Sequence, residues 1–546
     1  MSNDLTTPYG EGPMAAPRRG RRKLWVAAGV AGLTGVVGLA AVGGLAARDQ
    51  KSGGAEQTSN TQASAPKQNV SDTGKAEDIG GEKAAEGNRN DKDERHGKEE
   101  RGGKGEGRQR VKEVPCDTDK LIDAITQANR TDGATLKLAE HCTYTLTRHD
   151  QWGNGLPRIN QPITLKGDKT RIERDSTAKP FRILNVGPGG ELTLKGLTIK
   201  GGQLADEQQK DRSKDRVRWG STEPANGARA AAPEAAATTA EPGAAATPTP
   251  WPTDGHGHTP TEGAGLLVHQ GGSAVVEHSV FVQNHAAGDG GAIANFGTTR
   301  VAGTLIERNS AGGFGGGVFN GGVLKIEDSE LSRNSAEYGG GGLANGSSSK
   351  NGFEAGTVFV VKSEVSHNRT AGDGGGLADN GGTTSVSHSQ ITGNTAGSDV
   401  GGVLADTGSQ LTLTHTLVAR NSTEGRAGGV GVAKGAKAVI EHSLVKENVS
   451  DSDGGGLFTF GLAVLRDTEV LGNQAVGEHA RAGGIFNDGG KVSLIRTKVA
   501  ANFATKKPGG IYTTNDRVDI DSKSTVVDNR PTNCLGSPVV PDRCFG

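Results

Sequence analysis

The chain has 546 residues, and its 88 glycines are more than twice the roughly 7% share of an average protein. Only 33% of the residues are hydrophobic and 4% aromatic, which argues against a large α/β enzyme core. The 20 prolines are too few for collagen, and a formal net charge of −1 provides no basic field for nucleic acid. Disorder and a glycine-rich repeat fold remain.

The N-terminal segment predicts export. Residues 1–23 end in a basic cluster, and residues 24–47 carry no charge and are long enough to cross a bilayer, which takes about 20 residues. Because positive charge stays in the cytoplasm, we expect a single-pass cell-membrane anchor with an extracellular C-terminal domain. The alternative is a cleaved export signal, since Arg21-Arg22-Lys23-Leu24-Trp25 resembles a twin-arginine signal.

Residues 48–110 contain no aromatic residue, and 17 of the 30 residues in 81–110 are charged. Such a segment cannot bury enough apolar surface to offset the entropy of ordering it, so we predict a disordered charged linker.

A repeat of about 26 residues defines the rest of the chain. Gly316-Gly317-Val318-Phe319-Asn320 returns as Gly341-Gly342-Leu343-Ala344-Asn345 and as Gly483-Gly484-Ile485-Phe486-Asn487. A second asparagine closes each repeat, and the spacings run from 25 to 34 residues. These asparagines are Asn284, Asn309, Asn334, Asn368, Asn394, Asn421, Asn448, Asn473, Asn502 and Asn529.

Apolar and polar residues alternate within each repeat. Leu324, Ile326 and Leu331 are expected on one side of their strands, and Lys325, Glu327 and Glu330 on the other. Leucine-rich repeats have a similar period but need a leucine-dense consensus and a helical return, which are absent. Three short strands per repeat predict an all-β fold, a right-handed parallel β-helix (solenoid). Stacked asparagines would then hydrogen-bond along its axis.

Gly290-Gly291-Ala292-Ile293 and Phe281-Val282-Gln283-Asn284 resemble the repeats of polymorphic outer-membrane proteins, and residues 263–530 resemble bacterial right-handed β-helix surface proteins. The resemblance covers about half of the chain and implies a fold more than a function. No autotransporter barrel or wall-sorting tail is expected after the last coil, so the N-terminal segment would supply the anchor.

The segment 111–202 is predicted to hold the first coils and a short capping helix after Asp117 or Thr118. Residues 203–262 predict a disordered Ala/Pro-rich insertion, 263–533 the β-helix repeats and 534–546 a closed end. Cys116 and Cys142 lie about one coil apart, and Cys534 and Cys544 ten residues apart. Four cysteines allow three pairings; proximity along the chain favours one disulfide at each end, with free thiols as the alternative.

Stacking of the repeats predicts a charged column, read three residues before the last glycine of each glycine run. Asp399, Arg426, Asp453 and Arg481 alternate in sign along it, which favours a salt-bridge ladder or a strip that binds acidic or hydroxylated sugars. Asp373 precedes Asp399, so Ca²⁺ is a possible ligand at this point; no other cofactor is expected. The full column is Asp289, Phe314, Gly339, Asp373, Asp399, Arg426, Asp453, Arg481 and Lys507.

Two further columns carry side chains that could bind a ligand. His388, His415 and His442 fall on successive coils, where they predict an exposed polar ladder or a transition-metal site. Phe458, Phe486 and Tyr512 form a third column; interior packing is favoured, and an outward direction would make a platform for sugar rings.

These patterns favour a non-catalytic, membrane-anchored surface rod for adhesion or glycan binding, with membrane and polysaccharide as its expected partners. The alternative is a polysaccharide lyase or glycoside hydrolase that acts on acidic polysaccharide along the β-helix face. No Ser-His-Asp set and no firm acid–base carboxylate pair is visible in the sequence, so no catalytic residue is assigned.

Overall fold

The computed structural model describes residues 111–205, 261–347 and 355–546. The predicted basic tail, anchor and linker (1–23, 24–47 and 48–110) and most of the predicted insertion (203–262) lie outside this part of the chain. Within the described ranges, no helix is long and apolar enough to span a membrane.

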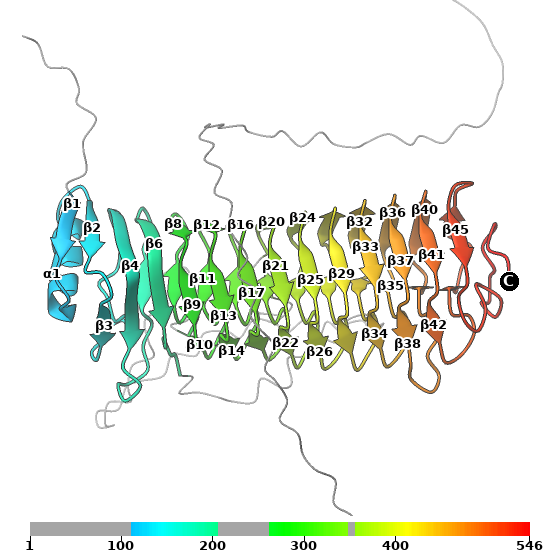
Figure 1. Ribbon diagram of the computed structural model, residues 1–546, viewed down its shortest axis with the longest axis horizontal. Helices are drawn as coiled ribbons and strands as arrows, with labels where there is room; N and C mark the ends of the chain where they lie inside the picture. The colour runs from blue at the N-terminus through cyan, green and yellow to red at the C-terminus, as the bar shows by residue number, and fades with distance from the viewer. Residues whose placement is uncertain (1–110, 206–260, 348–354) are drawn as a thin grey trace, which may run out of the picture. The chain divides into compact units, whose positions relative to one another are not determined.

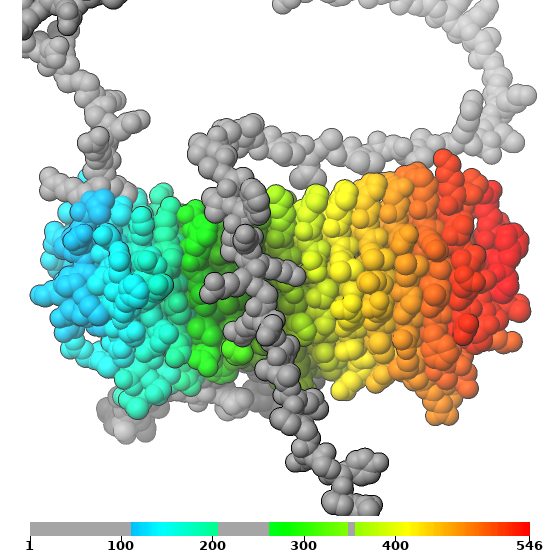
Figure 2. Space-filling model, in the orientation of Figure 1, coloured from blue at the N-terminus to red at the C-terminus, as the bar shows by residue number. Residues whose placement is uncertain are grey.

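The described residues form a parallel β-helix, so the predicted all-β solenoid is confirmed (Figure 1). All pairs of named strands are parallel, and each strand pairs with its counterpart in the next coil. Figure 2 shows the coils as successive bands from the first coils to the C-terminus. A regular coil has four strand segments distributed over three sheets, one segment more than the sequence predicts.

The first sheet has 11 strands, each of three residues. They are β5 (Leu184–Val186), β7 (Leu266–Val268), β11 (Ile293–Asn295), β15 (Val318–Asn320), β19 (Leu343–Asn345), β23 (Leu377–Asp379), β27 (Val403–Ala405), β31 (Val430–Val432), β35 (Leu457–Thr459), β39 (Ile485–Asn487) and β43 (Ile511–Thr513).

The second sheet has 25 strands in two parallel rows that meet at a corner. The N-terminal strands are β1 (Val111–Val114), β2 (Ala134–Leu138), β3 (Thr143–Leu146), β4 (Pro162–Arg174) and β6 (Glu191–Lys200). One row continues as β8 (Ser273–Glu277), β12 (Thr298–Ala302), β16 (Val323–Glu327), β20 (Thr357–Val361), β24 (Thr383–Ser387), β28 (Gln410–Thr414), β32 (Lys437–Glu441), β36 (Leu462–Arg466), β40 (Lys491–Ile495) and β44 (Val518–Ile520). The other row is β9 (Val280–Val282), β13 (Leu305–Glu307), β17 (Glu330–Ser332), β21 (Glu364–Ser366), β25 (Gln390–Thr392), β29 (Leu417–Ala419), β33 (Leu444–Lys446), β37 (Glu469–Leu471), β41 (Lys498–Ala500) and β45 (Thr525–Val527).

The third sheet has nine strands of two residues each. They are β10 (His285–Ala286), β14 (Ser310–Ala311), β18 (Ser335–Ala336), β22 (Arg369–Thr370), β26 (Thr395–Ala396), β30 (Ser422–Thr423), β34 (Val449–Ser450), β38 (Gln474–Ala475) and β42 (Phe503–Ala504).

Alternating burial places the core inside the cylinder. In β16, Leu324 and Ile326 are buried while Lys325 is exposed, as the sequence pattern predicts. One continuous hydrophobic cluster extends from Val114 to Cys544. The glycine pairs before the first sheet allow coils to approach closely: a Cβ on Gly291 would lie 2.2 Å from the carbonyl oxygen of Gly316 in the next coil.

Helix α1 (Thr118–Asn129) precedes the first complete coil. The Asp117 side chain accepts a hydrogen bond from the Lys120 N–H, so Asp117 is its N-cap. Leu121, Ile125 and Ala128 are buried on one face of the helix. Both predicted disulfides are present, Cys116–Cys142 and Cys534–Cys544.

Candidate functional site: an arginine–aromatic face

The predicted charged column is a physical row in the glycine-rich loops that lead into the first sheet. Phe314, Gly339 and Asp373 form backbone bridges from coil to coil, which confirms their alignment. Asp289, at the start of the row, accepts the backbone N–H of Phe314 through Oδ1 at 2.7 Å. The row therefore lies where strand pairing is interrupted and backbone donors need other acceptors.

The aspartates of the column supply those acceptors. Oδ1 of Asp373 accepts the Asp399 N–H at 2.8 Å, and Oδ1 of Asp399 accepts the Arg426 N–H at 2.7 Å. Asp453 does the same for the Arg481 N–H at 2.8 Å. Each carboxylate thus satisfies one main-chain donor of the following coil, a structural role that the sequence did not reveal.

The alternating charges form two fork-shaped ion pairs. Arg426 donates from Nη2 to Asp399 Oδ2 at 2.9 Å, and from Nε to Oδ1 at 3.3 Å. Arg481 repeats this geometry on Asp453 with the same two distances. The side chain of Asp399 is fully buried, while that of Arg481 is 36% exposed. The ladder is therefore only partly solvated, and a partly buried fork of this kind is stronger than an exposed surface pair.

The third column faces out of the cylinder. Leu457, Phe458 and Thr459 follow one another in β35, so Phe458 points opposite to its two neighbours. Leu457 is in register with Val430 and Ile485, the aliphatic row of the interior. The interior direction favoured from the sequence is therefore wrong, although Phe458 is buried.

The outward rings form a continuous stack. The Phe458 and Phe486 ring centroids lie 4.7 Å apart with an interplanar angle of 5°, and those of Phe486 and Tyr512 lie 4.6 Å apart at 21°. Phe460 contacts this stack from the following turn, with its centroid 5.0 Å from that of Phe458. Phe460 is not among the residues predicted from the sequence, although the alternation in Phe458-Thr459-Phe460 could have indicated it.

The two arginines lie over these rings. Arg481 Cζ is 4.4 Å from the Tyr512 ring centroid and 5.1 Å from that of Phe486. Arg426 Cζ lies 5.2 Å from the Phe458 centroid. We call this surface the arginine–aromatic face; its residues are Asp399, Arg426, Asp453, Phe458, Phe460, Arg481, Phe486 and Tyr512.

Arg481 has the most complete set of contacts on this face. Nη1 donates to the Tyr512 hydroxyl at 2.7 Å, in addition to the fork with Asp453. Burial alone would lower the pKa of Arg481, but the hydrogen bonds and the charge of Asp453 raise it above its usual value. The guanidinium is therefore a permanent cation in a fixed orientation, with two of its five N–H groups outside these three bonds.

The histidine column is present on another corner of the cylinder. His388, His415 and His442 are exposed and take left-handed backbone conformations, with φ near 50°. Their rings stack face to face, with centroids 4.8 Å and then 5.0 Å apart. Parallel rings direct their nitrogen lone pairs in parallel rather than toward one point. The described ranges hold no group of three His, Cys, Asp or Glu side chains that could bind a metal ion.

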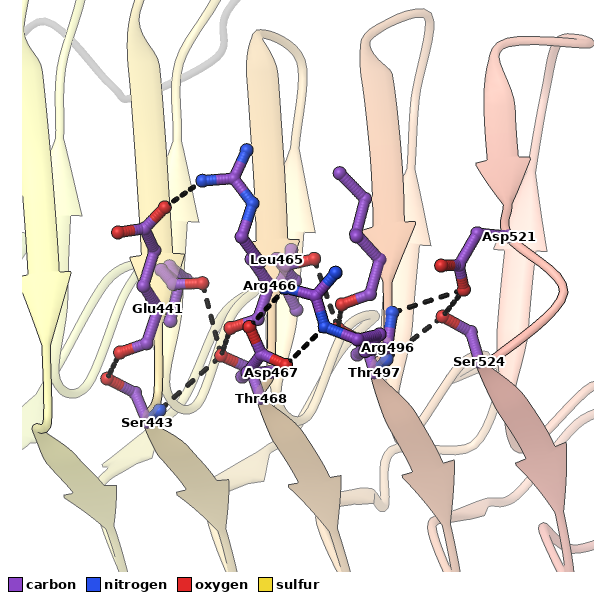
Figure 3. A network of polar contacts seen from close by, with 12 residues as sticks. Glu441, Ser443, Leu465, Arg466, Asp467, Thr468, Arg496, Thr497, Asp521 and Ser524 are labelled. Atoms are coloured by element: carbon purple, nitrogen blue, oxygen red, sulfur yellow. Dashed lines mark hydrogen bonds and ion pairs between the residues drawn. The ribbon is translucent and has the colours of Figure 1, made fainter.

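The same corner continues toward the C-terminus as a hydrogen-bonded polar row. Asp467 and Arg496 follow the histidines and form a fork, with Nε to Oδ1 at 2.6 Å and Nη2 to Oδ2 at 2.5 Å (Figure 3). Beneath it, the Ser443 N–H donates to the Thr468 hydroxyl at 3.4 Å. These bonds give the C-terminal part of the column a structural role at the corner.

Comparison with known proteins does not identify a family. No protein-family model matches the chain, and no curated protein sequence matches it significantly. Among solved structures, the periplasmic alginate epimerase AlgG matches with 9% identity over 75% of this chain and 81% of that chain (TM-score 0.30).

Two other solved structures give similar scores. The A-module of mannuronan C-5 epimerase AlgE6 from Azotobacter vinelandii has 13% identity over 78% of this chain and 95% of that chain (TM-score 0.29). PfbA, a surface adhesin of Streptococcus pneumoniae, has 10% identity over 73% and 89% (TM-score 0.32). Similarity at this level carries no argument about activity.

Proposed function

We propose that the protein is an exported, membrane-anchored right-handed β-helix rod that binds acidic polysaccharide on its arginine–aromatic face. Helix α1 would close the N-terminal end of the rod, and residues 24–47 would anchor it. The observation that carries the proposal is Arg481, a partly exposed side chain whose guanidinium is fixed by Asp453 and Tyr512 above stacked rings.

This geometry suits a uronic-acid residue. The carboxylate of the sugar would accept the guanidinium N–H groups that Asp453 and Tyr512 leave outside their bonds, because arginine favours planar, two-point recognition of carboxylates. The buried rings beneath it hold the guanidinium plane in place through cation–π contacts, which lowers the entropy lost when the carboxylate binds. Arg426, which forms the same fork with Asp399 two coils before Arg481, would offer a second contact along a polymer, so that the two weak contacts add by multivalency.

A second candidate is polysaccharide cleavage, favoured by the 2.7 Å contact between Arg481 and the Tyr512 hydroxyl. An arginine can neutralise the uronate carboxylate, and a phenolic oxygen beside it can exchange a proton with the sugar. Release of unsaturated uronate ends from polygalacturonate, measured by ultraviolet absorbance, would favour this candidate over simple binding.

The binding proposal is tested by isothermal titration of the full chain with polygalacturonate and with its carboxyl-reduced, neutral counterpart. We expect binding of the acidic polymer only, weakening as salt rises. Arg481→Gln should weaken it at least tenfold, because it removes the fixed cation and the fork.

Arg496→Gln is the matched control, because Arg496 forms an equivalent fork with Asp467 on the corner of the histidine column, outside the arginine–aromatic face. Its binding should equal that of the unchanged chain. Equal losses in the two variants, or equal binding of the neutral polymer, would contradict the proposal, and thermal midpoints of both variants would show whether either is unfolded.

A further inference from the structure

A cavity of about 980 Å³ lies near the N-terminal end, between helix α1 and the segment 148–160. Its lining includes Asn129 and Arg130 at the end of the helix, and Arg148, Trp152 and Arg158 from the segment opposite. The volume is that of a small-molecule site. None of these residues belongs to the arginine–aromatic face.

Trp152 is presented on a built turn. Oδ1 of Asp150 accepts the N–H groups of Trp152 and Asn154, both at 2.8 Å, and the Asp150 N–H donates to the Asn154 carbonyl oxygen at 2.9 Å. Gly153, between them, has φ +73°, a conformation that other residues rarely adopt. The turn is therefore fixed by four residues, yet Trp152 at its tip is 50% exposed.

An exposed indole beside a cavity needs a reason, because the large apolar surface of tryptophan gains free energy when it is removed from water. Of the aromatic side chains in the described ranges, Trp152 offers the largest ring system. Indoles present a flat apolar surface with a polar N–H, which suits one face of a sugar ring. The rigidity of the turn lowers the entropy lost when a ligand is bound.

The cavity is lined by three arginines and three aspartates, so its formal charges balance, but the two kinds of side chain are unevenly paired. Each lining carboxylate has a donor: Asp119 pairs with Arg148 at 2.8 Å, Asp123 lies 3.9 Å from Lys120, and Asp150 accepts the turn N–H groups. Arg130 and Arg158, in contrast, form no side-chain ion pair or hydrogen bond among the residues that the structure describes. Two guanidinium groups therefore remain without a carboxylate.

Arg158 carries an unsatisfied donor. Its Nε is buried and has no hydrogen-bond partner within the described residues. The main chain around it is anchored, since the Asn129 side chain donates to the Arg158 carbonyl oxygen at 2.8 Å and accepts the Asn160 N–H at 2.9 Å. A buried donor without a partner costs stability, and a movement of this side chain toward an anionic ligand in the cavity would remove that cost.

We propose that this cavity binds a hexuronate residue, with the pyranose ring on the Trp152 indole and the carboxylate on Arg158 and Arg130. The site lies at the N-terminal end, beside helix α1, and is independent of the polymer-binding face.

The test is saturation-transfer NMR and isothermal titration of the full chain carrying Arg481→Gln, with D-glucuronic acid, D-glucose and inorganic phosphate as separate probes. The Arg481→Gln background removes the other proposed uronate site. We expect glucuronate to bind at least tenfold more tightly than glucose or phosphate. Trp152→Ala and Arg158→Gln should each weaken glucuronate binding tenfold or more.

Phe359→Ala is the matched control, because Phe359 is an exposed ring on β20, far along the chain from the cavity. Its glucuronate affinity should be unchanged. If glucose binds as tightly as glucuronate, the arginines do not recognise a carboxylate. If phosphate still binds after Trp152→Ala, the cavity is an inorganic anion site. Either result overturns the proposal. If Arg481→Gln abolishes polymer binding and leaves glucuronate binding intact, the two sites are separate.

Discussion

Asp379 is the residue whose environment departs most from the pattern around it. It occupies the position in β23 that asparagine holds in the preceding coils, where Asn295, Asn320 and Asn345 hydrogen-bond in sequence. Its Oδ1 accepts the Gly382 N–H at 2.8 Å, but its Oδ2 has no hydrogen-bond partner among the described residues. Burial raises the pKa of Asp379 to about 6, and the hydrogen bonds from neighbouring groups only partly offset that shift.

Asp379→Asn should therefore stabilise the protein at neutral pH. The pKa of Asp379 is about 6 in the folded state and about 3.9 in an unfolded chain, so ionisation disfavours the folded state increasingly from about pH 4 to pH 6, and fully above that. The shift corresponds to about 3 kcal/mol at pH 7.5. We expect the variant to have the higher thermal midpoint at pH 7.5 and an equal midpoint at pH 4, measured by circular dichroism. A variant advantage that does not change with pH would contradict this account.

At the scale of the element, the asparagine ladder fixes the register of the coils. Each member accepts two hydrogen bonds from the preceding asparagine. Asn421 Oδ1, for example, accepts one from the main-chain N–H of Asn394 at 3.0 Å and one from the side-chain Nδ2 of Asn394 at 2.9 Å. Asn421 Nδ2 also donates to the Ile391 carbonyl oxygen at 2.9 Å. The motifs at Asn368, Asn421 and Asn448 that match glycosylation sites are buried members of this ladder.

Asn421→Ala should destabilise the protein by about 2–5 kcal/mol, because it leaves two buried donors and one buried acceptor without partners. Gln410→Ala, at an exposed position of β28 in the preceding part of the coil, should change the free energy of unfolding by less than about 0.5 kcal/mol. Urea denaturation followed by circular dichroism at 218 nm would compare them. Similar midpoints for both variants would show that the ladder contributes little.

Much of this arrangement could be predicted because equivalent positions of successive repeats occupy equivalent environments. The Asn421 ladder, the alternation around Ile326 and the Cys116–Cys142 pairing all follow from spacing. The outward direction of Phe458 could not be predicted, since it depends on Arg426 from the preceding loop covering the ring. Trp152 lies in a segment without repeats, so no column placed it beside Arg158.

At the scale of the whole molecule, the stack needs closed ends, because an uncovered coil presents a row of unpaired main-chain groups. The segment after β45 provides the partners of the last coil. Asn533 takes the place of the next ladder asparagine, accepting the Asn529 N–H at 3.1 Å, and its carbonyl oxygen accepts the Ile511 N–H at 2.8 Å. The Ser537 hydroxyl accepts the Thr513 N–H at 2.8 Å, and Cys534–Cys544 holds this segment in a closed loop.

Removal of residues 531–546 should therefore convert the protein into an end-to-end associating species. The truncation exposes the N–H groups of Ile511, Thr513 and Asn529, and a parallel edge of this kind pairs readily with another chain. Size-exclusion chromatography with light scattering should show oligomers that increase with concentration. The double variant Cys534→Ala/Cys544→Ala is the control, because it keeps the covering segment. It should lose thermal stability, since the disulfide restrains the loop. It should not associate, since Asn533 and Ser537 still provide the acceptors. A truncated chain of unchanged mass and thermal midpoint would show that the last coil needs no cover.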